Sequence, residues 1–130
     1  MKLIDTSVIV RFLTRDDPRK AERARKLLLE SDEELLITDG VFIELVFVLE
    51  KVYGLPGIEI YTQLGKLLSS PRIAFSDREL LLQALVLYRE HDVSFIDAYQ
   101  VALGRALGAE AIYTYDEDFE SKLRFPSLEP

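Results

Sequence analysis

The sequence predicts an α/β fold: a single domain over residues 1–130, with a central, mainly parallel sheet of four to five short strands flanked by helices. Two observations support this expectation. Short apolar segments alternate along the chain with longer segments whose apolar residues recur at helical spacing, which is typical of parallel strands joined by helices. The chain also has 130 residues, of which 48% are hydrophobic, so it is large enough to bury one core.

The predicted strands are short and apolar. They cover residues 2–4, 35–37, 73–75 and 111–114, with residues 125–128, at Pro126 and before Pro130, as a last edge strand. The first of them ends at Asp5, and the chain is expected to turn there directly into a helix. Such strand ends are where open parallel sheets bind their ligands.

Residues that favour helix ends mark the helices between the strands. Asp17 and Pro18 suit the N-cap and the first helical position of one helix. Thr38 and Asp39 can cap another helix, which runs through Val41 to about Tyr53, and Ser76 is expected to cap the helix that follows the third strand. Further helices are predicted around residues 58–68 and from Ser94 to Gly108, with a turn or short helix at residues 116–119.

Composition excludes several classes of protein. There is no Cys, hence no disulfide framework and no thiolate chemistry. No apolar run reaches about 18 residues, so no membrane span is expected. The chain enters its first strand at residue 2, which leaves no room for a signal peptide, and a cytoplasmic location is expected.

The net charge of −7 is unevenly distributed. Residues 11–26 contain seven basic and three acidic side chains, a local charge of +4, so the rest of the chain carries −11. A solvated helix face explains such a run, and so does a surface that binds phosphates. The sequence alone leaves both interpretations open.

Glu44 stands out because it is the only polar residue among residues 41–49. A helix that is apolar on all sides is buried, and a lone buried carboxylate is costly unless it is paired or bound to a cation. We therefore expect Glu44 to be buried and functional. The alternative is a narrow exposed stripe that it shares with Glu50 and Lys51.

Three other acids lie at places that meet on one edge of a parallel sheet. Asp5 and Asp116 follow predicted strands, and Asp97 lies in the first turn of a helix. Each has an ordinary explanation as a helix cap, a capping-box acid or a turn residue. Together, however, carboxylates gathered at one edge would repel one another, and a hard divalent cation, Mg²⁺ or Mn²⁺, would relieve that repulsion.

These motifs resemble the four blocks of the PIN-domain nucleases. The matching segments are Asp5-Thr6-Ser7, Glu44 in its apolar helix, Ser94-Phe95-Ile96-Asp97-Ala98 and Thr114-Tyr115-Asp116-Glu117-Asp118-Phe119. The resemblance covers the whole chain, and the length and order resemble toxin ribonucleases of the VapC type. It implies that Asp5, Glu44, Asp97 and Asp116 bind Mg²⁺ or Mn²⁺ and that the domain cuts RNA.

The resemblance also implies supporting residues and partners. Ser7 and Thr114 match the small polar positions of the family and would orient carboxylates or waters, whereas Asp118 is an additional acid. The expected partners are an RNA substrate, a small cognate antitoxin protein and a second copy of the chain. The homodimer is expected to use apolar residues of two helices, namely Phe42, Phe47, Val48 and Tyr61.

Two other functions are weighed against a nuclease. A non-catalytic PIN-like domain could bind RNA or protein, but all four acids are present here. A phosphatase or receiver-type domain built on Asp5 would need a Lys near the acids, and no Lys stands at the end of a predicted strand.

Overall fold

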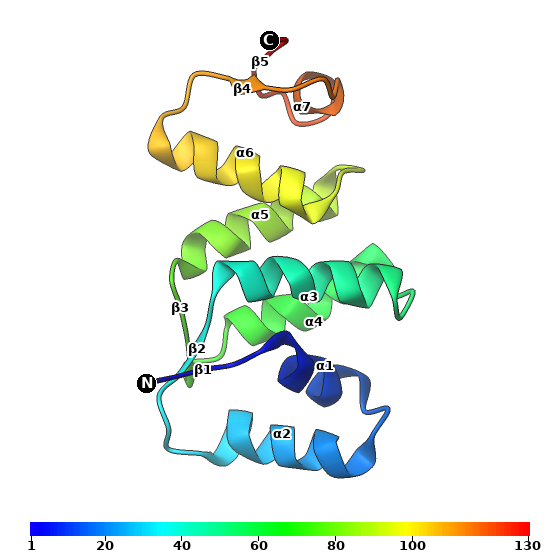
Figure 1. The fold of residues 1–130 in the computed structure, drawn as a ribbon, viewed down its shortest axis with the longest axis vertical. Helices are drawn as coiled ribbons and strands as arrows, with labels where there is room; N and C mark the ends of the chain where they lie inside the picture. Colours follow the sequence, from blue (N-terminus) through cyan, green and yellow to red (C-terminus); the bar gives the residue numbers. More distant parts are fainter. The chain divides into compact units, whose positions relative to one another are not determined.

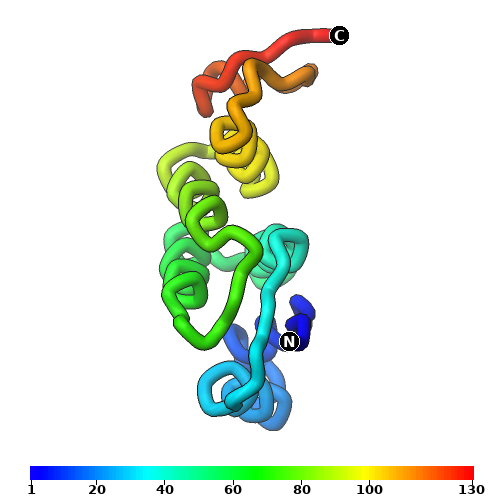
Figure 2. Tube along the Cα trace, turned by 90° about the vertical axis from the view of Figure 1, so that its left-hand side faces the viewer, coloured from blue at the N-terminus to red at the C-terminus, as the bar shows by residue number.

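The computed structural model describes residues 1–130, which form two units, residues 1–78 and residues 79–130. Figure 1 labels the helices and strands, and Figure 2 follows the same chain as a Cα trace. The chain contains no helix with the length and apolar character needed to cross a membrane.

The first unit is built on a three-stranded parallel sheet. Its elements are β1 (Lys2–Leu3), α1 (Thr6–Thr14), α2 (Pro18–Glu30), β2 (Leu35–Ile37), α3 (Asp39–Lys51), α4 (Gly57–Leu68) and β3 (Ile73–Phe75). Strand β2 lies in the middle and pairs in parallel with both β1 and β3. Figure 2 shows β2 in cyan as the extended link between α2 and α3. Because the strands are parallel, the segments that follow them leave from the same edge of the sheet.

The helices of this unit begin where the sequence predicts. The carboxylate of Asp17 accepts a hydrogen bond from the amide of Lys20 (3.1 Å), and Pro18 is the first residue of α2. Thr38 caps α3 in the same way, through the amide of Val41 (3.3 Å). Both caps satisfy amides that have no partner within their helix.

The core of the first unit lies among the apolar faces of its helices and the middle strand. Its fully buried side chains include Ile9, Leu28, Ile37, Phe42, Leu45, Leu49, Ile60 and Leu64. The rings of Phe42 and Phe75 meet edge to face at 6.3 Å. Arg78 closes the unit: its guanidinium donates to the carbonyls of Leu68, Ser70 and Ile73 and lies over the Phe75 ring, 4.8 Å from its centre.

The second unit contains most of α5 (Arg78–Glu90), then α6 (Phe95–Leu107), β4 (Ile112–Tyr113), α7 (Asp118–Ser121) and β5 (Ser127–Leu128). Helix α6 ends at Gly108, whose φ of 72° is the left-handed conformation that glycine adopts without strain. Val101, Phe119, Leu123 and Phe125 form the buried cluster that holds α6 to the C-terminal segment.

The predicted α/β fold with parallel strands and flanking helices is confirmed, but the sheet of the first unit has three strands, fewer than the four to five expected. All five predicted segments contain strands, and within the second unit β4 pairs in parallel with β5. Two backbone hydrogen bonds hold this pair together. The amides of Ile112 and Thr114 donate to the carbonyls of Pro126 and Leu128, at 2.9 Å each.

Two smaller expectations concern Ser76 and Phe42. Helix α5 begins at Arg78, so Asp77 and not Ser76 occupies the position immediately before it. Phe42 cannot contribute to a dimer surface, because it is fully buried in the core of its own unit. Phe47, in contrast, is exposed on α3.

Candidate functional site

Asp5 is held in place by the turn that leads from β1 into α1. It is the N-cap of α1, and its Oδ2 accepts hydrogen bonds from the Ser7 hydroxyl (2.8 Å) and the Ser7 amide (3.3 Å). Both bonds lower the pKa of Asp5 below its usual value, and the bond from the Ser7 hydroxyl has the larger effect. The helix cap and the functional interpretation of Asp5 are therefore compatible, because capping keeps the carboxylate ionised and oriented.

Glu44 is exposed on α3, which corrects the expectation that it is buried. Although most residues of α3 are apolar, the helix turns one side outward, and Glu44, Phe47 and Lys51 lie there. The carboxylate is nevertheless anchored: its Oε2 accepts a hydrogen bond of 2.7 Å from the hydroxyl of Thr6. Thr6 is only 6% exposed and is the one buried polar residue of the chain.

Asp5 and Glu44 line the same pocket. Its remaining lining residues are Thr6, Ser7, Val10, Arg11, Val48 and Tyr53. The structure thus brings together two of the four predicted acids and Ser7, and it adds Thr6, which the sequence analysis did not single out. Its signal was its place in Asp5-Thr6-Ser7, three and four residues before the buried Ile9 and Val10.

One wall of this pocket is a small polar network around Asp16. The carboxylate accepts two hydrogen bonds from Arg11 (2.9 Å each) and one from the Tyr53 hydroxyl (3.0 Å). Thr14 donates a further hydrogen bond at 3.2 Å. These bonds lower the pKa of Asp16, and the bond from Arg11 has the largest effect. Arg11 is thereby held on the wall of the pocket with its charge offset by Asp16.

Asp97 and Asp116, the other two predicted acids, belong to the second unit. Asp97 lies in the first turn of α6, whose N-cap Ser94 accepts the Asp97 amide at 3.3 Å. Partial burial raises the pKa of Asp97, and the negative charges of Asp116 and Asp118 raise it further. Asp97 therefore lies near enough to Asp116 and Asp118 for their negative charges to disfavour its ionised form.

Thr114 shapes the loop that carries Asp116. Its hydroxyl accepts the Asp116 amide at 2.9 Å, and Asp116 Oδ1 in turn accepts the Asp118 amide at 2.8 Å. This places Thr114 beside Asp116, as Ser7 stands beside Asp5. Asp118 also forms an ion pair with Lys122 (3.5 Å), so part of its charge is offset.

The donor atoms suit a hard divalent cation. Carboxylate oxygens are ligands that Mg²⁺ and Mn²⁺ favour, and all four acids supply them; in Asp5 and Glu44 the carboxylate also accepts a hydrogen bond from a hydroxyl group. Neither unit by itself gathers three or more acidic or histidine side chains into a group that could hold a metal ion. The residues therefore fit the cation in their chemistry, with two acids on a pocket of the first unit and two in the second.

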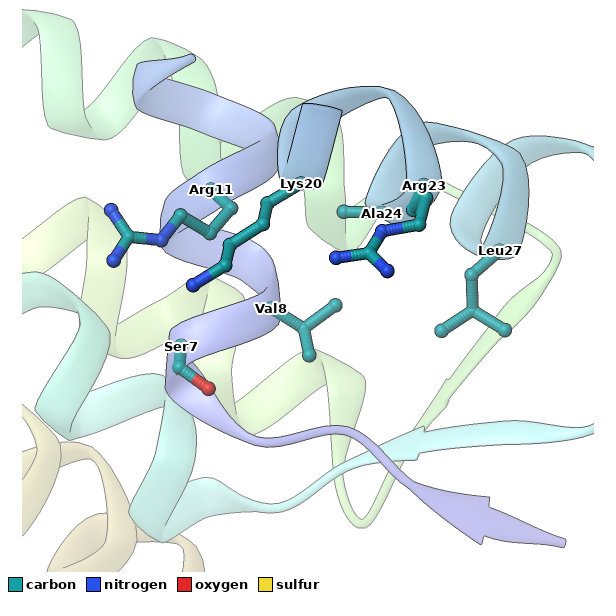
Figure 3. A pocket seen from close by; sticks show the side chains of 7 residues that line it. All are labelled: Ser7, Val8, Arg11, Lys20, Arg23, Ala24 and Leu27. Atoms are coloured by element: carbon teal, nitrogen blue, oxygen red, sulfur yellow. The ribbon is translucent and has the colours of Figure 1, made fainter. Parts of the chain in front are cut away.

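A second pocket adjoins the first and has a different character. It lies between α1 and α2 and is lined by Ser7, Val8, Arg11, Lys20, Arg23, Ala24 and Leu27. Figure 3 shows Lys20 and Arg23 reaching from α2 over this pocket toward α1. No acidic residue lines it.

Comparison with known proteins gives one family match. The model of the family described as PIN domain matches residues 2–122. Among solved structures, the crystal structure of VapC20 of Mycobacterium tuberculosis, a toxin that cleaves the sarcin–ricin loop, is 25% identical; the match covers 98% of each chain with a TM-score of 0.43. That TM-score is low, so the assignment of the chain to a family depends on the family model alone. No curated protein matches the chain.

Proposed function

Because the chain belongs to the PIN domain family, we propose that it is an endoribonuclease that hydrolyses RNA phosphodiester bonds with the help of a divalent cation. The observation that supports this most strongly is the pocket of the first unit, where Asp5 and Glu44 are each held by a hydroxyl group of the same turn. Hydroxyl groups that orient carboxylates in this way are typical of the groups that support metal ligands.

Asp5, Glu44, Asp97 and Asp116 are proposed as the carboxylates that hold Mg²⁺ or Mn²⁺. When bound, the cation would lower the pKa of a water molecule and offset the negative charge of the phosphate. Ser7 holds Asp5, Thr6 holds Glu44, and Thr114 sets the loop of Asp116. These three residues are positioning residues, since their hydroxyl groups act through the carboxylates.

We further propose that the protein is the toxin of a type II toxin–antitoxin pair. The support is the order and spacing of the four motifs in a chain of 130 residues, which resemble VapC-type toxins. The partners would be RNA, a small cognate antitoxin that inhibits cleavage, and a second copy of the chain, in the cytoplasm. The exposed Phe47 on α3 is available for the homodimer. Light scattering that shows a monomer at high micromolar concentration would contradict that part.

The nuclease proposal is tested with purified protein and single-stranded RNA. We expect cleavage in Mn²⁺ or Mg²⁺ and none in excess chelator. Asp5→Asn keeps the size of the side chain but removes a ligand charge, so cleavage should be abolished while the fold persists. Asp32→Asn, in an exposed loop, is the matched control and should cleave like the wild type. Full activity of Asp5→Asn, or wild-type activity in chelator, would disprove the proposal. RNA binding without cleavage would favour a non-catalytic module.

A further inference from the structure

The pocket between α1 and α2 carries positive charge in a chain whose net charge is −7. Arg11, Lys20 and Arg23 line it, and its apolar surface comes from Val8, Ala24 and Leu27 (Figure 3). An occupant that suits this lining has an anionic group for the cations and a flat or apolar part for the rest.

Only some of the cations on these two helices are available to an occupant. Arg11 is paired with Asp16, and Arg25 is paired with both Glu22 and Glu30. Lys20 and Arg23 make no ion pair and no side-chain hydrogen bond, and both are exposed. The acids nearest to them in sequence are occupied, because Asp17 caps α2 and Glu22 holds Arg25.

The position of this pocket connects it with the acidic one. Ser7 and Arg11 line both pockets, so the surface with Lys20 and Arg23 begins where the surface with Asp5 and Glu44 ends. A nucleic-acid strand carries a phosphate at every nucleotide. A strand whose bond lies at the acidic pocket therefore presents a neighbouring phosphate to the adjoining surface.

We propose that Lys20 and Arg23 bind one phosphate of the RNA strand next to the bond that is cleaved, and that Val8 and Leu27 contact the attached nucleoside. This assignment rests on the proposed function, because it takes RNA as the substrate. It makes α2 a substrate-binding helix whose contacts depend on two cations, and it leaves Arg19 and Lys26 on the same helix without a role in that contact.

The first test measures binding without cleavage. A short, labelled, single-stranded oligoribonucleotide is titrated in chelator with wild type, with Lys20→Ala/Arg23→Ala, and with the control Arg19→Ala/Lys26→Ala, which removes one Arg and one Lys from the same helix. Loss of one phosphate contact should weaken binding by about fivefold at 0.1 M salt and reduce the slope of log K against log salt by about 0.7. The control should keep the wild-type affinity and slope.

The second test locates the phosphate. A neutral methylphosphonate is placed at one linkage at a time along the oligonucleotide. One position should weaken binding to the wild type and to the control, yet leave the Lys20→Ala/Arg23→Ala variant unaffected, because that variant has already lost the contact. Equal losses for both double variants, or no position that behaves in this way, would overturn the subsite.

The outcomes also separate this inference from the proposed function. If the wild type fails to cleave RNA in Mn²⁺, the nuclease proposal is wrong whatever the binding data show. If the wild type cleaves but Lys20→Ala/Arg23→Ala binds and cleaves like the control, the phosphate subsite alone is wrong. Binding of a polyglutamate peptide as tight as that of RNA, with the same dependence on Lys20 and Arg23, would assign the pocket to an acidic peptide and overturn the proposal.

Discussion

Replacing Thr6 by Val separates the role of its hydroxyl group in positioning Glu44 from any role in folding. The wild-type hydroxyl donates a 2.7 Å hydrogen bond to Glu44 and is itself buried. A hydrogen bond of this kind contributes about 1 kcal/mol to stability, and water can replace it because Glu44 is exposed. Burying a methyl group in place of the hydroxyl returns about 0.8 kcal/mol. The free energy of unfolding, measured in urea, should therefore change by less than about 1 kcal/mol.

Cleavage should respond much more strongly than stability. Loss of a group that orients a ligand typically lowers metal affinity or activity by about 10- to 100-fold, and we expect a decrease in this range for Thr6→Val. The assay is the initial rate of RNA cleavage as a function of Mn²⁺ concentration. Glu44→Gln provides the second arm of a double-mutant cycle, since Thr6→Val should add little once the carboxylate has been replaced. Wild-type cleavage by Thr6→Val across the Mn²⁺ range would refute the positioning role.

Three further substitutions test other parts of the structure. Glu44→Gln should alter the free energy of unfolding in chelator by no more than about 0.5 kcal/mol, because the side chain is exposed. The rise in melting temperature on adding Mn²⁺ should be smaller than in the wild type, and an equal rise would remove Glu44 from the site. Arg78→Lys should lower the free energy of unfolding by about 2 kcal/mol, since a lysine cannot donate to the carbonyls of Leu68, Ser70 and Ile73 together. Urea unfolding curves that match those of the wild type would contradict this. Asp16→Asn should be less stable than the wild type at pH 7. The difference should vanish as the pH falls below about 3.8, because a carboxylate with a lowered pKa contributes stability only while it is ionised. A difference that does not change with pH would rule out the charge of Asp16 as the cause.

Local features of the fold were predictable from the sequence because they depend on neighbouring residues. Asp17 before Pro18 and Ser94 before α6 cap helices through bonds that span three residues, so the pattern alone locates them. The pairing of β4 was not predictable in this way. Both β4 and β5 have only two residues, and their register depends on contacts between distant segments.

In the candidate site, too, the features set by neighbouring residues were predictable and those set by distant contacts were not. Asp5 could be found because its place after a strand and before Thr6 and Ser7 is a sequence feature. The burial of Glu44 was predicted wrongly, because a mostly apolar helix still exposes the side that its neighbours leave uncovered. Thr6 was missed for a related reason: its place beside Asp5 was visible in the sequence, but its burial and its bond to a residue 38 positions away depend on the fold.

The binding of Mn²⁺, measured by calorimetry, tests the central claim most directly. The wild type should bind Mn²⁺, and each of Asp5→Asn, Glu44→Gln, Asp97→Asn and Asp116→Asn should bind it more weakly, by about tenfold or more, because each removes a ligand charge. Asp32→Asn should bind like the wild type. A wild-type protein that binds no Mn²⁺, or four variants that bind it as the wild type does, would contradict the assignment of these acids as the metal ligands of an RNA-hydrolysing enzyme.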